Sequence, residues 1–419
     1  MKSDAYYLTA RQAADALGVT AATLYAYTSR GQLRSEPIPG SPRERRYYRD
    51  DVERLRERKE TRRDPSKAAA RGLHWGGPVL ESGITLIHEG RVYYRGRDAV
   101  ALAETANLED IAALLWSADE IERERLLEQS AALSARQLAA LRATVKDPLA
   151  MIQAALPIAG ASDLAALDLR APAVRLTGAR ILRLMATIVA PRRSANHLRQ
   201  GHGGQEAFAR RGHIHRMLQA EWVPRRDAVA DVIRTALVLC ADHELNVSAF
   251  TARCAASAGA SPYDVASAAM ATLKGYKHGG AGERVMALLA QSDTMRSART
   301  LIADRMRGGQ RLPGFGHPLY PSGDPRAALL LRLAESSGND AESRRARALS
   351  KAGGELLDDL PNLDFGLAAV TRAYGLPAQA PVLLFALGRT VGWIAHAIEE
   401  YATNRLIRPR ARYTGPPPV

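Results

Sequence analysis

Cysteine is nearly absent from this chain of 419 residues, which contains only Cys240 and Cys254. Two cysteines cannot build a disulfide framework, and such scarcity is typical of a reducing compartment, so we expect a cytoplasmic location. Aromatic residues make up only 5% of the chain. We find no apolar signal core at the N-terminus and no apolar run of membrane length, and therefore expect no association with a membrane.

Runs of β-branched residues are short, whereas alanine and leucine dominate. This composition predicts a mostly helical protein, and the length allows two or three domains. The formal net charge is +14, and residues 1–70 carry 15 Lys/Arg against 10 Asp/Glu. A basic surface attracts nucleic acid or acidic metabolites, and charge alone does not choose between them.

The first 60 residues have the spacing of a helix-turn-helix. Thr9 is positioned to cap a first helix, and Gly18 supplies a turn. Thr20 then caps a second helix from Ala21 to about Ser29. The segment SPRERRYY from Ser41 is expected to form a turn or wing with arginines at its tip.

Residues 1–60, including RYYRDDVERL, resemble the small winged helix-turn-helix domain of the MerR and excisionase type. DNA binding is one interpretation, with the arginines contacting phosphates. Packing against a neighbouring domain or dimerisation is the alternative. The residues expected to contact DNA are Thr23, Tyr27, Arg30, Arg43, Arg45 and Arg46. Residues 61–72 are expected to form a linker.

The remaining chain reads as one helical segment after another from Pro148 onward, preceded by a short strand at Val92–Tyr94. Four histidines lie between Ser194 and His215, where they could bind a metal. No cysteine supports such a site, so we expect a polar connection between helices and assign no metal. The four histidines are His197, His202, His213 and His215.

Several segments marked by glycine or proline each present one charged or titratable side chain. In LPGFGHPLYPSGDPRA, Leu312–Ala327, prolines disfavour a long helix and leave a stiff loop. Each side chain alone could be a helix cap or an internal ion-pair partner, and Asp364 in particular could be an N-cap. Together they suit a carboxylate substrate and proton transfer at a carbon atom. The set is His243, His278, His317, Arg326, Asp364, Arg389 and Arg408.

The motifs ADHELNVSA, HGGAGERV, PGFGHPLYPSGDPRA, NLDF, FALGRTVGWIAH and IRPRARYTG occur in that order, and YYRGRDAVALAE…ALLW precedes them. With these motifs, residues 73–415 resemble the citrate synthase family. The resemblance implies an all-α fold behind the small winged domain. A large domain would comprise residues 73–279 and 379–419, and a small domain residues 280–378.

The resemblance also implies an activity. The family condenses acetyl-CoA with oxaloacetate and hydrolyses the resulting citryl-CoA. By motif position, Asp364 would remove the methyl proton, and His278 would hydrogen-bond the thioester oxygen. His317 would polarise and protonate the oxaloacetate carbonyl.

The family's oxaloacetate ligands correspond to His243, His317, Arg326, Arg389 and Arg408. In the family the last of these arginines comes from the other subunit of a homodimer, which is therefore implied here. The resemblance implies no metal or redox cofactor.

Three departures from the family pattern concern the CoA side: Lys277 before His278, Gly282 in HGGAGE, and Pro321–Gly323 without a basic residue. A 2-methylcitrate synthase that uses propionyl-CoA therefore remains an alternative, since one methylene changes selectivity only modestly. An alternative of a different class is a DNA-binding regulator that uses the synthase body as a metabolite sensor.

Overall fold

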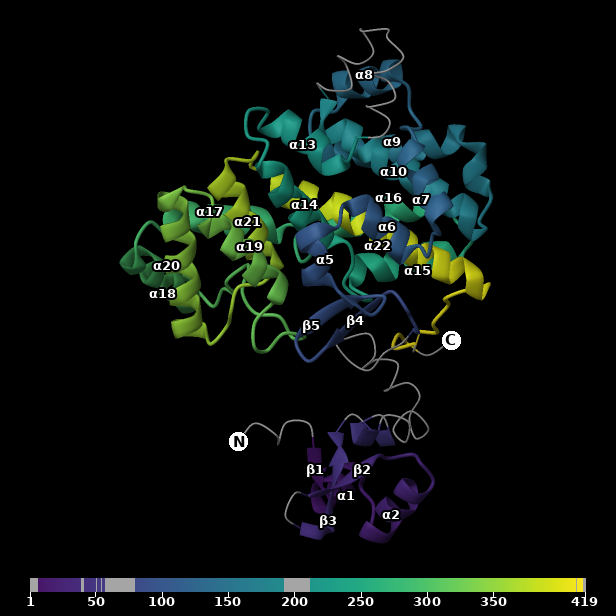
Figure 1. Ribbon diagram of the computed structural model, residues 1–419, viewed down its shortest axis with the longest axis vertical. Coiled ribbons are helices and arrows are strands. Elements are labelled where there is room, and N and C mark those ends of the chain that lie inside the picture. The colour runs from purple at the N-terminus through teal and green to yellow at the C-terminus, as the bar shows by residue number, and fades with distance from the viewer. Residues whose placement is uncertain are drawn as a thin grey trace. The chain divides into compact units, whose positions relative to one another are not determined.

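The computed structural model describes residues 7–38, 41–49, 51–53, 55–56, 80–191, 212–411 and 413–416. The chain divides into an N-terminal unit, Met1–Glu81, and a body, Ser82–Val419, and each has its own hydrophobic core (Figure 1). The expected linker at 61–72 lies outside the described residues. So do His197 and His202.

The described part of the N-terminal unit combines two helices, and further helical residues at 51–53 and 55–56, with an antiparallel three-stranded sheet in the order β1-β3-β2. Its elements are β1 (Tyr7–Thr9), α1 (Ala10–Leu17), α2 (Ala21–Ser29), β2 (Ser35–Ile38) and β3 (Ser41–Tyr48).

Local capping explains the two helices. Thr9 and Gln12 form a capping box at the start of α1, and Gly18 ends α1 with a left-handed φ of 58°. The Thr20 side chain accepts a hydrogen bond from the backbone of Thr23 and so caps α2. The helix-turn-helix prediction is confirmed.

The expected wing is present as a β-hairpin, in which Ser41–Tyr48 forms the central strand β3 and pairs antiparallel with β2, so the segment is mostly strand and not turn. Tyr47 is fully buried in the core of the unit, which anchors this strand. Arg46 pairs with Glu36 on β2, and its guanidinium carbon lies 3.9 Å from the ring centroid of Tyr7. The side chain of Arg46 is therefore part of the sheet surface.

The body begins with a small antiparallel sheet in the order β4-β5-β6 and continues as helices. The strands are β4 (Thr85–His88), β5 (Arg91–Tyr94) and β6 (Arg97–Asp98), of which β5 is the short strand expected at Val92–Tyr94. The first helices are α5 (Ala99–Thr105), α6 (Leu108–Leu115), α7 (Glu120–Glu128), α8 (Ala135–Thr144), α9 (Pro148–Ser162), the 3₁₀ turn η1 (Leu164–Leu167), α10 (Ala171–Val189) and α13 (Ile214–Trp222). The others are α14 (Val229–Cys240), α15 (Val247–Ser257), α16 (Pro262–Leu273), α17 (Ala281–Gln291), α18 (Met295–Arg307), α19 (Pro325–Glu335), α20 (Asp340–Leu357), α21 (Leu363–Tyr374) and α22 (Ala380–Thr403).

Helix α22 runs through the core of the body, and α10, α14, α15 and α16 pack against it. It is long and apolar enough to cross a bilayer, so the expectation of no membrane-length apolar run is wrong for this helix. However, 89% of its most apolar window is buried inside the protein. This helix is therefore a core helix of the body.

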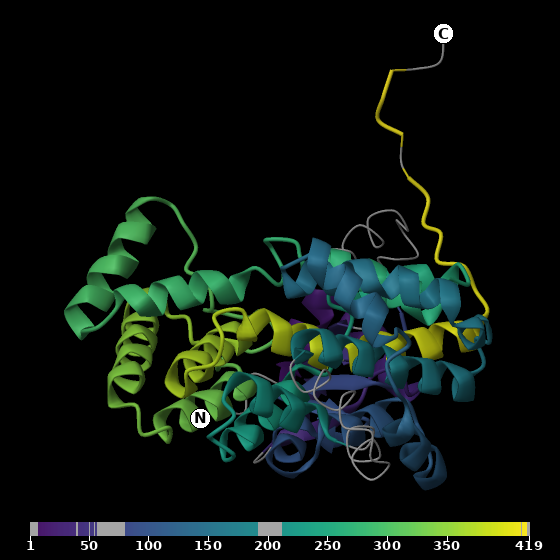
Figure 2. The same ribbon diagram turned by 90° about the horizontal axis from the view of Figure 1, so that it is seen from above.

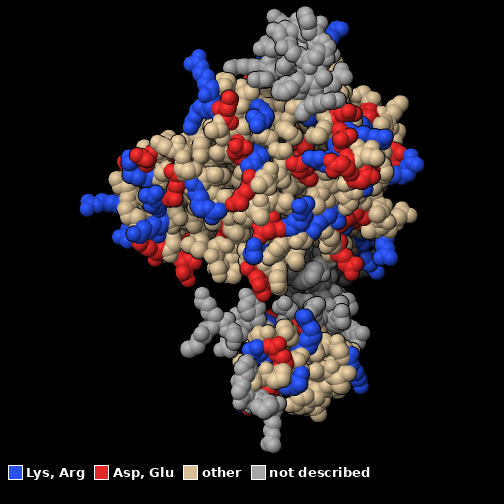
Figure 3. All heavy atoms as spheres, viewed as in Figure 1, with Lys and Arg blue, Asp and Glu red and all other residues tan. Residues whose placement is uncertain are grey.

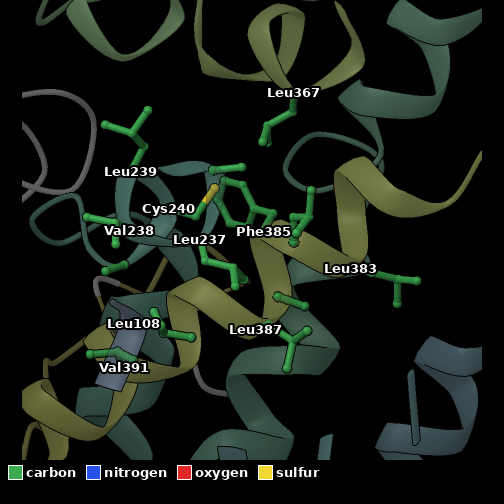
Figure 4. Packing of buried hydrophobic residues seen from close by; sticks show 14 of the residues in the cluster. Leu108, Leu237, Val238, Leu239, Cys240, Leu367, Leu383, Phe385, Leu387 and Val391 are labelled. Carbon is green, nitrogen blue, oxygen red and sulfur yellow. The ribbon is translucent and has the colours of Figure 1, made fainter. Parts of the chain in front are cut away.

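Helices α14 and α22 approach each other closely because α22 has glycines at the crossing. A Cβ atom on Gly388 would lie 2.5 Å from the carbonyl oxygen of Leu237, and one on Gly392 would lie 2.4 Å from Asp242. In Figure 4, Cys240 at the end of α14 lies next to Phe385 of α22. This contact sets the end of α14 beside the middle of α22.

Helices α17 to α21 gather at one side of the body (Figures 1 and 2). Within this group, α19 packs on α21 and α18 packs on α20. The group falls within residues 280–378, for which a small domain remains our prediction.

Candidate functional site

The loop that carries His317 joins α18 to α19 and is fixed by its glycines. Gly316 has a φ of 69°, and a Cβ atom there would lie 2.7 Å from Asp359. The backbone of Gly316 donates to the carbonyl of Leu360 at 2.9 Å. Asn362 completes the attachment, because its Nδ2 donates to the carbonyl of Gly316 at 3.1 Å. The loop is thus bound to the segment that leads into α21.

A backbone hydrogen bond within the loop fixes the tautomer of His317. The backbone N–H of Leu319 donates to Nδ1 of His317 at 3.2 Å. Burial, and then the nearby charge of Arg326, lower the pKa of His317 to about 4. The ring is therefore neutral near pH 7, with its proton on Nε2, which can donate a hydrogen bond.

Arg326 lies in the first turn of α19 and is buried. Its Nε and Nη2 donate to the two carboxylate oxygens of Asp324 at 3.0 and 2.8 Å. Asp324 also accepts from the backbone of Leu363 at 3.0 Å, which ties α19 to α21. Because Asp324 occupies the Nε–Nη2 edge, a substrate carboxylate would meet the remaining Nη1 side of the fork.

His243 follows the end of α14 and lies beside His317, with ring centroids 5.0 Å apart. Burial, together with Arg326 and Arg389, holds the pKa of His243 well below its usual range. Its Nε2 shares a hydrogen bond of 2.9 Å with the hydroxyl of Tyr320. Our sequence interpretation missed Tyr320, although it stands three residues after His317.

Arg389 on α22 joins the same cluster. Its Nε donates to the carbonyl of Cys240 at 2.8 Å, so it has the internal partner that its apolar surroundings suggested. Its guanidinium carbon lies 4.6 Å from the ring centroid of Phe385. Phe385 also contacts His278, whose ring centroid lies 5.7 Å from that of Phe385.

His278 stands three residues before the start of α17 and is held by Ser248. The Ser248 hydroxyl donates to Asn246 at 2.8 Å and accepts from the indole of Trp393 at 3.1 Å. Because this hydroxyl has a single proton, the 2.9 Å contact requires that Nε2 of His278 donates. Burial, and then Arg389, lower the pKa of His278 to about 4, so the ring is neutral with Nε2 protonated.

Asp364 lies at the second position of α21 and is only partly exposed. The N-cap of α21 is Asn362, whose Oδ1 accepts from the backbone of Asp364 at 3.1 Å. The alternative that Asp364 is itself the cap is therefore wrong. Burial raises the pKa of Asp364 to about 6, against the opposing effect of Arg326.

Arg408 is the one candidate that the structure does not bring to this cluster. It is exposed and follows the end of α22 in the C-terminal segment, which extends away from the body in Figure 2.

A polar hollow of about 500 Å³ lies elsewhere, and none of the catalytic or oxaloacetate-binding candidates lines it. His213 and His215 contribute to it, with stacked rings 5.4 Å apart, and His213 lies 3.4 Å from Glu109. Within the described ranges, no group of three or more His, Cys, Asp or Glu side chains could hold a metal.

Some of the candidate DNA contacts are exposed, and others already bond or pack within the N-terminal unit. Arg30 and Arg45 are exposed, although Arg45 donates to the Ser35 hydroxyl at 2.8 Å. Thr23 bonds Thr20 at 3.0 Å. Tyr27, an expected DNA contact, packs partly against the core of the unit.

Tyr25 is the more exposed aromatic of α2, at 53% exposure, and our sequence interpretation missed it. Arg43 lies in β3, and its side chain is outside the described part. Figure 3 shows Lys and Arg interspersed with Asp and Glu over the visible face of the body.

These observations define a class of protein. A mostly helical body gathers three neutral histidines, two buried arginines and one carboxylate with a raised pKa. Such a set suits an enzyme that moves a proton beside a bound anion.

Comparison with known proteins makes the class specific. The family description "Citrate synthase, C-terminal domain" matches residues 72–410, and "Helix-turn-helix domain" matches residues 7–60. The chain belongs to the citrate synthase family and carries an additional helix-turn-helix domain at its N-terminal end.

Relatives and solved structures agree with this assignment. A citrate synthase of Haloferax volcanii is 33% identical over 82% of this chain and 95% of its own length. Citrate synthase 2 of Bacillus subtilis is 31% identical over 83% and 96%. The citrate synthase of Thermoplasma acidophilum, solved with carboxymethyl coenzyme A and oxaloacetate, superposes with a TM-score of 0.69 at 26% identity, over 84% of this chain and 97% of that one.

Proposed function

We propose that this protein condenses acetyl-CoA with oxaloacetate and hydrolyses the citryl-CoA intermediate, releasing citrate and CoA. The observation that carries the proposal is the position of Asp364, a carboxylate with a pKa of about 6, within the electrostatic reach of Arg326 and Arg389. Besides burial, the charges of both arginines also lower the pKa of His243. Arg389 lowers the pKa of His278, and Arg326 lowers that of His317, again in addition to burial.

Oxaloacetate binds to the buried cationic side of the cluster. The unpaired side of the Arg326 fork and the Nη atoms of Arg389 meet its carboxylates, and His243 adds a hydrogen bond. Nε2–H of neutral His317 donates to the ketone oxygen. That bond strengthens as negative charge develops on the oxygen, which favours the transition state over the bound ketone.

Asp364 removes a methyl proton from the thioester. A carboxylate can do so only if the developing enolate oxygen is stabilised at once, which is the role of His278. Nε2–H of His278 donates to Ser248 in the present geometry, so it exchanges Ser248 for the thioester oxygen when acetyl-CoA binds. The enolate carbon then attacks the ketone carbon of oxaloacetate, and the ketone oxygen takes up the Nε2 proton of His317. Water cleaves the thioester of the resulting citryl-CoA to give citrate and CoA.

Arg408 completes the oxaloacetate site from the other subunit of a homodimer. Its exposure and its place on the C-terminal segment fit a residue that reaches out of its own chain. Residues 280–378 act as the small domain and close over the substrates, which excludes water from the enolate. The reaction uses no metal or redox cofactor and takes place in the cytoplasm.

The direct test is to mix the purified protein with oxaloacetate and an acyl-CoA and to follow the release of free thiol. We expect faster release with acetyl-CoA than with propionyl-CoA. Faster release with propionyl-CoA would establish the 2-methylcitrate alternative. Absence of thiol release with both would overturn the proposal.

A second role is favoured by the separately folded N-terminal unit, which we propose binds duplex DNA through α2. Exposed Tyr25 and Arg30 lie on or beside this helix. Metabolite binding in the body could then regulate DNA binding by this unit, while the body keeps its catalytic role. Retention on duplex DNA that weakens with salt is the expected behaviour.

A further inference from the structure

Tyr320 contacts each of three residues that our proposed function places around oxaloacetate. Its hydroxyl is 2.9 Å from Nε2 of His243, and its ring centroid is 5.0 Å from that of His317. The guanidinium carbon of Arg326 lies 5.3 Å from the same ring. Tyr320 is therefore the side chain that connects the two histidines with the buried arginine.

The loop places Tyr320 there by a tight turn after His317. The backbone N–H of Tyr320 donates to the carbonyl of His317 at 2.9 Å, and that of Gly323 donates to the carbonyl of Tyr320 at 3.0 Å. The side chain is only 3% exposed, so its hydroxyl cannot readily replace His243 with water. The turn thus directs a buried hydroxyl at the His243 ring.

The chemistry of this contact restricts His243. Burial raises the pKa of Tyr320 to about 12, so its hydroxyl stays protonated. A neutral imidazole has one N–H and one acceptor nitrogen, and the hydrogen bond made by one nitrogen fixes the role of the other. By occupying Nε2, the hydroxyl holds the His243 ring in one orientation before the substrate arrives.

We propose that Tyr320 is a positioning residue for oxaloacetate, which fixes the ring of His243 through its hydroxyl and packs between His317 and Arg326. This inference rests on the proposed function, because it assigns a purpose to Tyr320 within the same site. A tyrosine that only filled the core would be replaceable by phenylalanine without a change in substrate binding.

The test compares Tyr320→Phe with Tyr374→Phe as the matched control. Tyr374 is also buried, and its hydroxyl donates to the carbonyl of Leu333 at 2.8 Å on α19, but it contacts no candidate site residue. Each variant loses one buried hydroxyl and keeps its ring. The measurements are kcat, the KM for each substrate, and the dissociation constant for oxaloacetate alone from calorimetry on the full chain.

We expect Tyr320→Phe to raise both the oxaloacetate KM and its dissociation constant about tenfold, the effect of losing one hydrogen bond in a buried site. The KM for acetyl-CoA should change little, and kcat should fall less than the affinity. Tyr374→Phe should leave all of these values close to those of the unaltered protein.

Unchanged oxaloacetate affinity in Tyr320→Phe would overturn the inference, and so would an equal effect in both variants. These outcomes are distinct from failure of the proposed function, in which the unaltered protein releases no thiol. If the unaltered protein binds oxaloacetate without turnover, the calorimetric comparison still decides the role of Tyr320. If it does not bind oxaloacetate, the inference is wrong together with the function.

Discussion

At the scale of single residues, burial sets the protonation states of the site. It lowers the pKa values of His278 and His317 to about 4 and raises that of Asp364 to about 6. Near pH 7 the body therefore holds neutral histidines that can donate hydrogen bonds and a carboxylate that can accept a proton. A positively charged histidine would stabilise the enolate too strongly, and the enolate carbon would then attack the ketone of oxaloacetate more slowly.

These residue identities were predictable, but their partners were not. Glycine and proline mark His278 and His317 in the sequence, whereas Tyr320 reads as an ordinary core aromatic. Its bond to His243 joins residues 77 positions apart. The pairing of Arg326 with Asp324 is local, yet the sequence does not reveal which edge of the arginine fork it occupies.

The pH dependence of turnover follows from Asp364. The base acts only when ionised, so kcat should rise with pH through about 6 and reach a plateau above about 7. His278 and His317 have pKa values of about 4 and should not titrate in this range. A pH profile of thiol release between pH 5 and pH 9, with a control for stability at each pH, measures it. A fall in kcat between pH 5 and pH 7 would contradict this assignment.

At the scale of elements, one asparagine connects the helix that carries the proposed base with the loop that carries His317. Asn362 caps α21, which carries Asp364, and its amide nitrogen also holds the loop that carries His317. The sequence predicted both segments, but not their connection, because a capping residue and a loop carbonyl 46 positions away have no shared pattern. The same limit applies to β3, because the sequence did not show that Tyr47 anchors it as the central strand of the sheet.

Two substitutions separate these functions of Asn362. Asn362→Asp keeps a capping oxygen but loses the donor to Gly316, whereas Asn362→Ala loses both. We expect Asn362→Asp to retain stability within about 1 kcal/mol and to lower kcat/KM about tenfold. Asn362→Ala should also lower the free energy of unfolding by about 1–2 kcal/mol. Thermal unfolding and steady-state kinetics measure both. Equal kcat/KM for Asn362→Asp and the unaltered protein would show that the loop does not need this bond.

At the scale of the whole molecule, two separately packed units share one chain. The sequence predicted both, since capping patterns mark the helix-turn-helix and the ordered motifs mark the body. The sequence also predicted that Arg389 lies inside an apolar helix, α22, but it did not reveal the partners of that arginine. Burial of that arginine is possible because Cys240 offers a carbonyl and Asp242 a nearby negative charge.

The N-terminal unit gives a prediction about nucleic acid. Arg30→Ala and Arg45→Ala should each weaken binding of the full chain to duplex DNA and lower the salt slope by about one unit per lost phosphate contact. Arg46→Ala should act mainly on stability, because Arg46 is bound to Glu36 and lies over Tyr7. Fluorescence anisotropy at several salt concentrations measures the binding. If Arg30→Ala and Arg45→Ala both bind like the unaltered chain at low salt, α2 and β3 are not the contact surface.

The central claim is that Asp364 is the base of a condensing site assembled from the body, and Asp364→Asn tests it most directly. Thiol release from acetyl-CoA and oxaloacetate should fall at least about a thousandfold, while calorimetry should find oxaloacetate affinity nearly unchanged. At pH 8 the variant should unfold at no lower temperature than the unaltered protein. An ionised carboxylate whose pKa is raised in the fold costs stability above that pKa, here up to about 3 kcal/mol. Full thiol release by Asp364→Asn, or loss of oxaloacetate binding together with stability, would contradict the account.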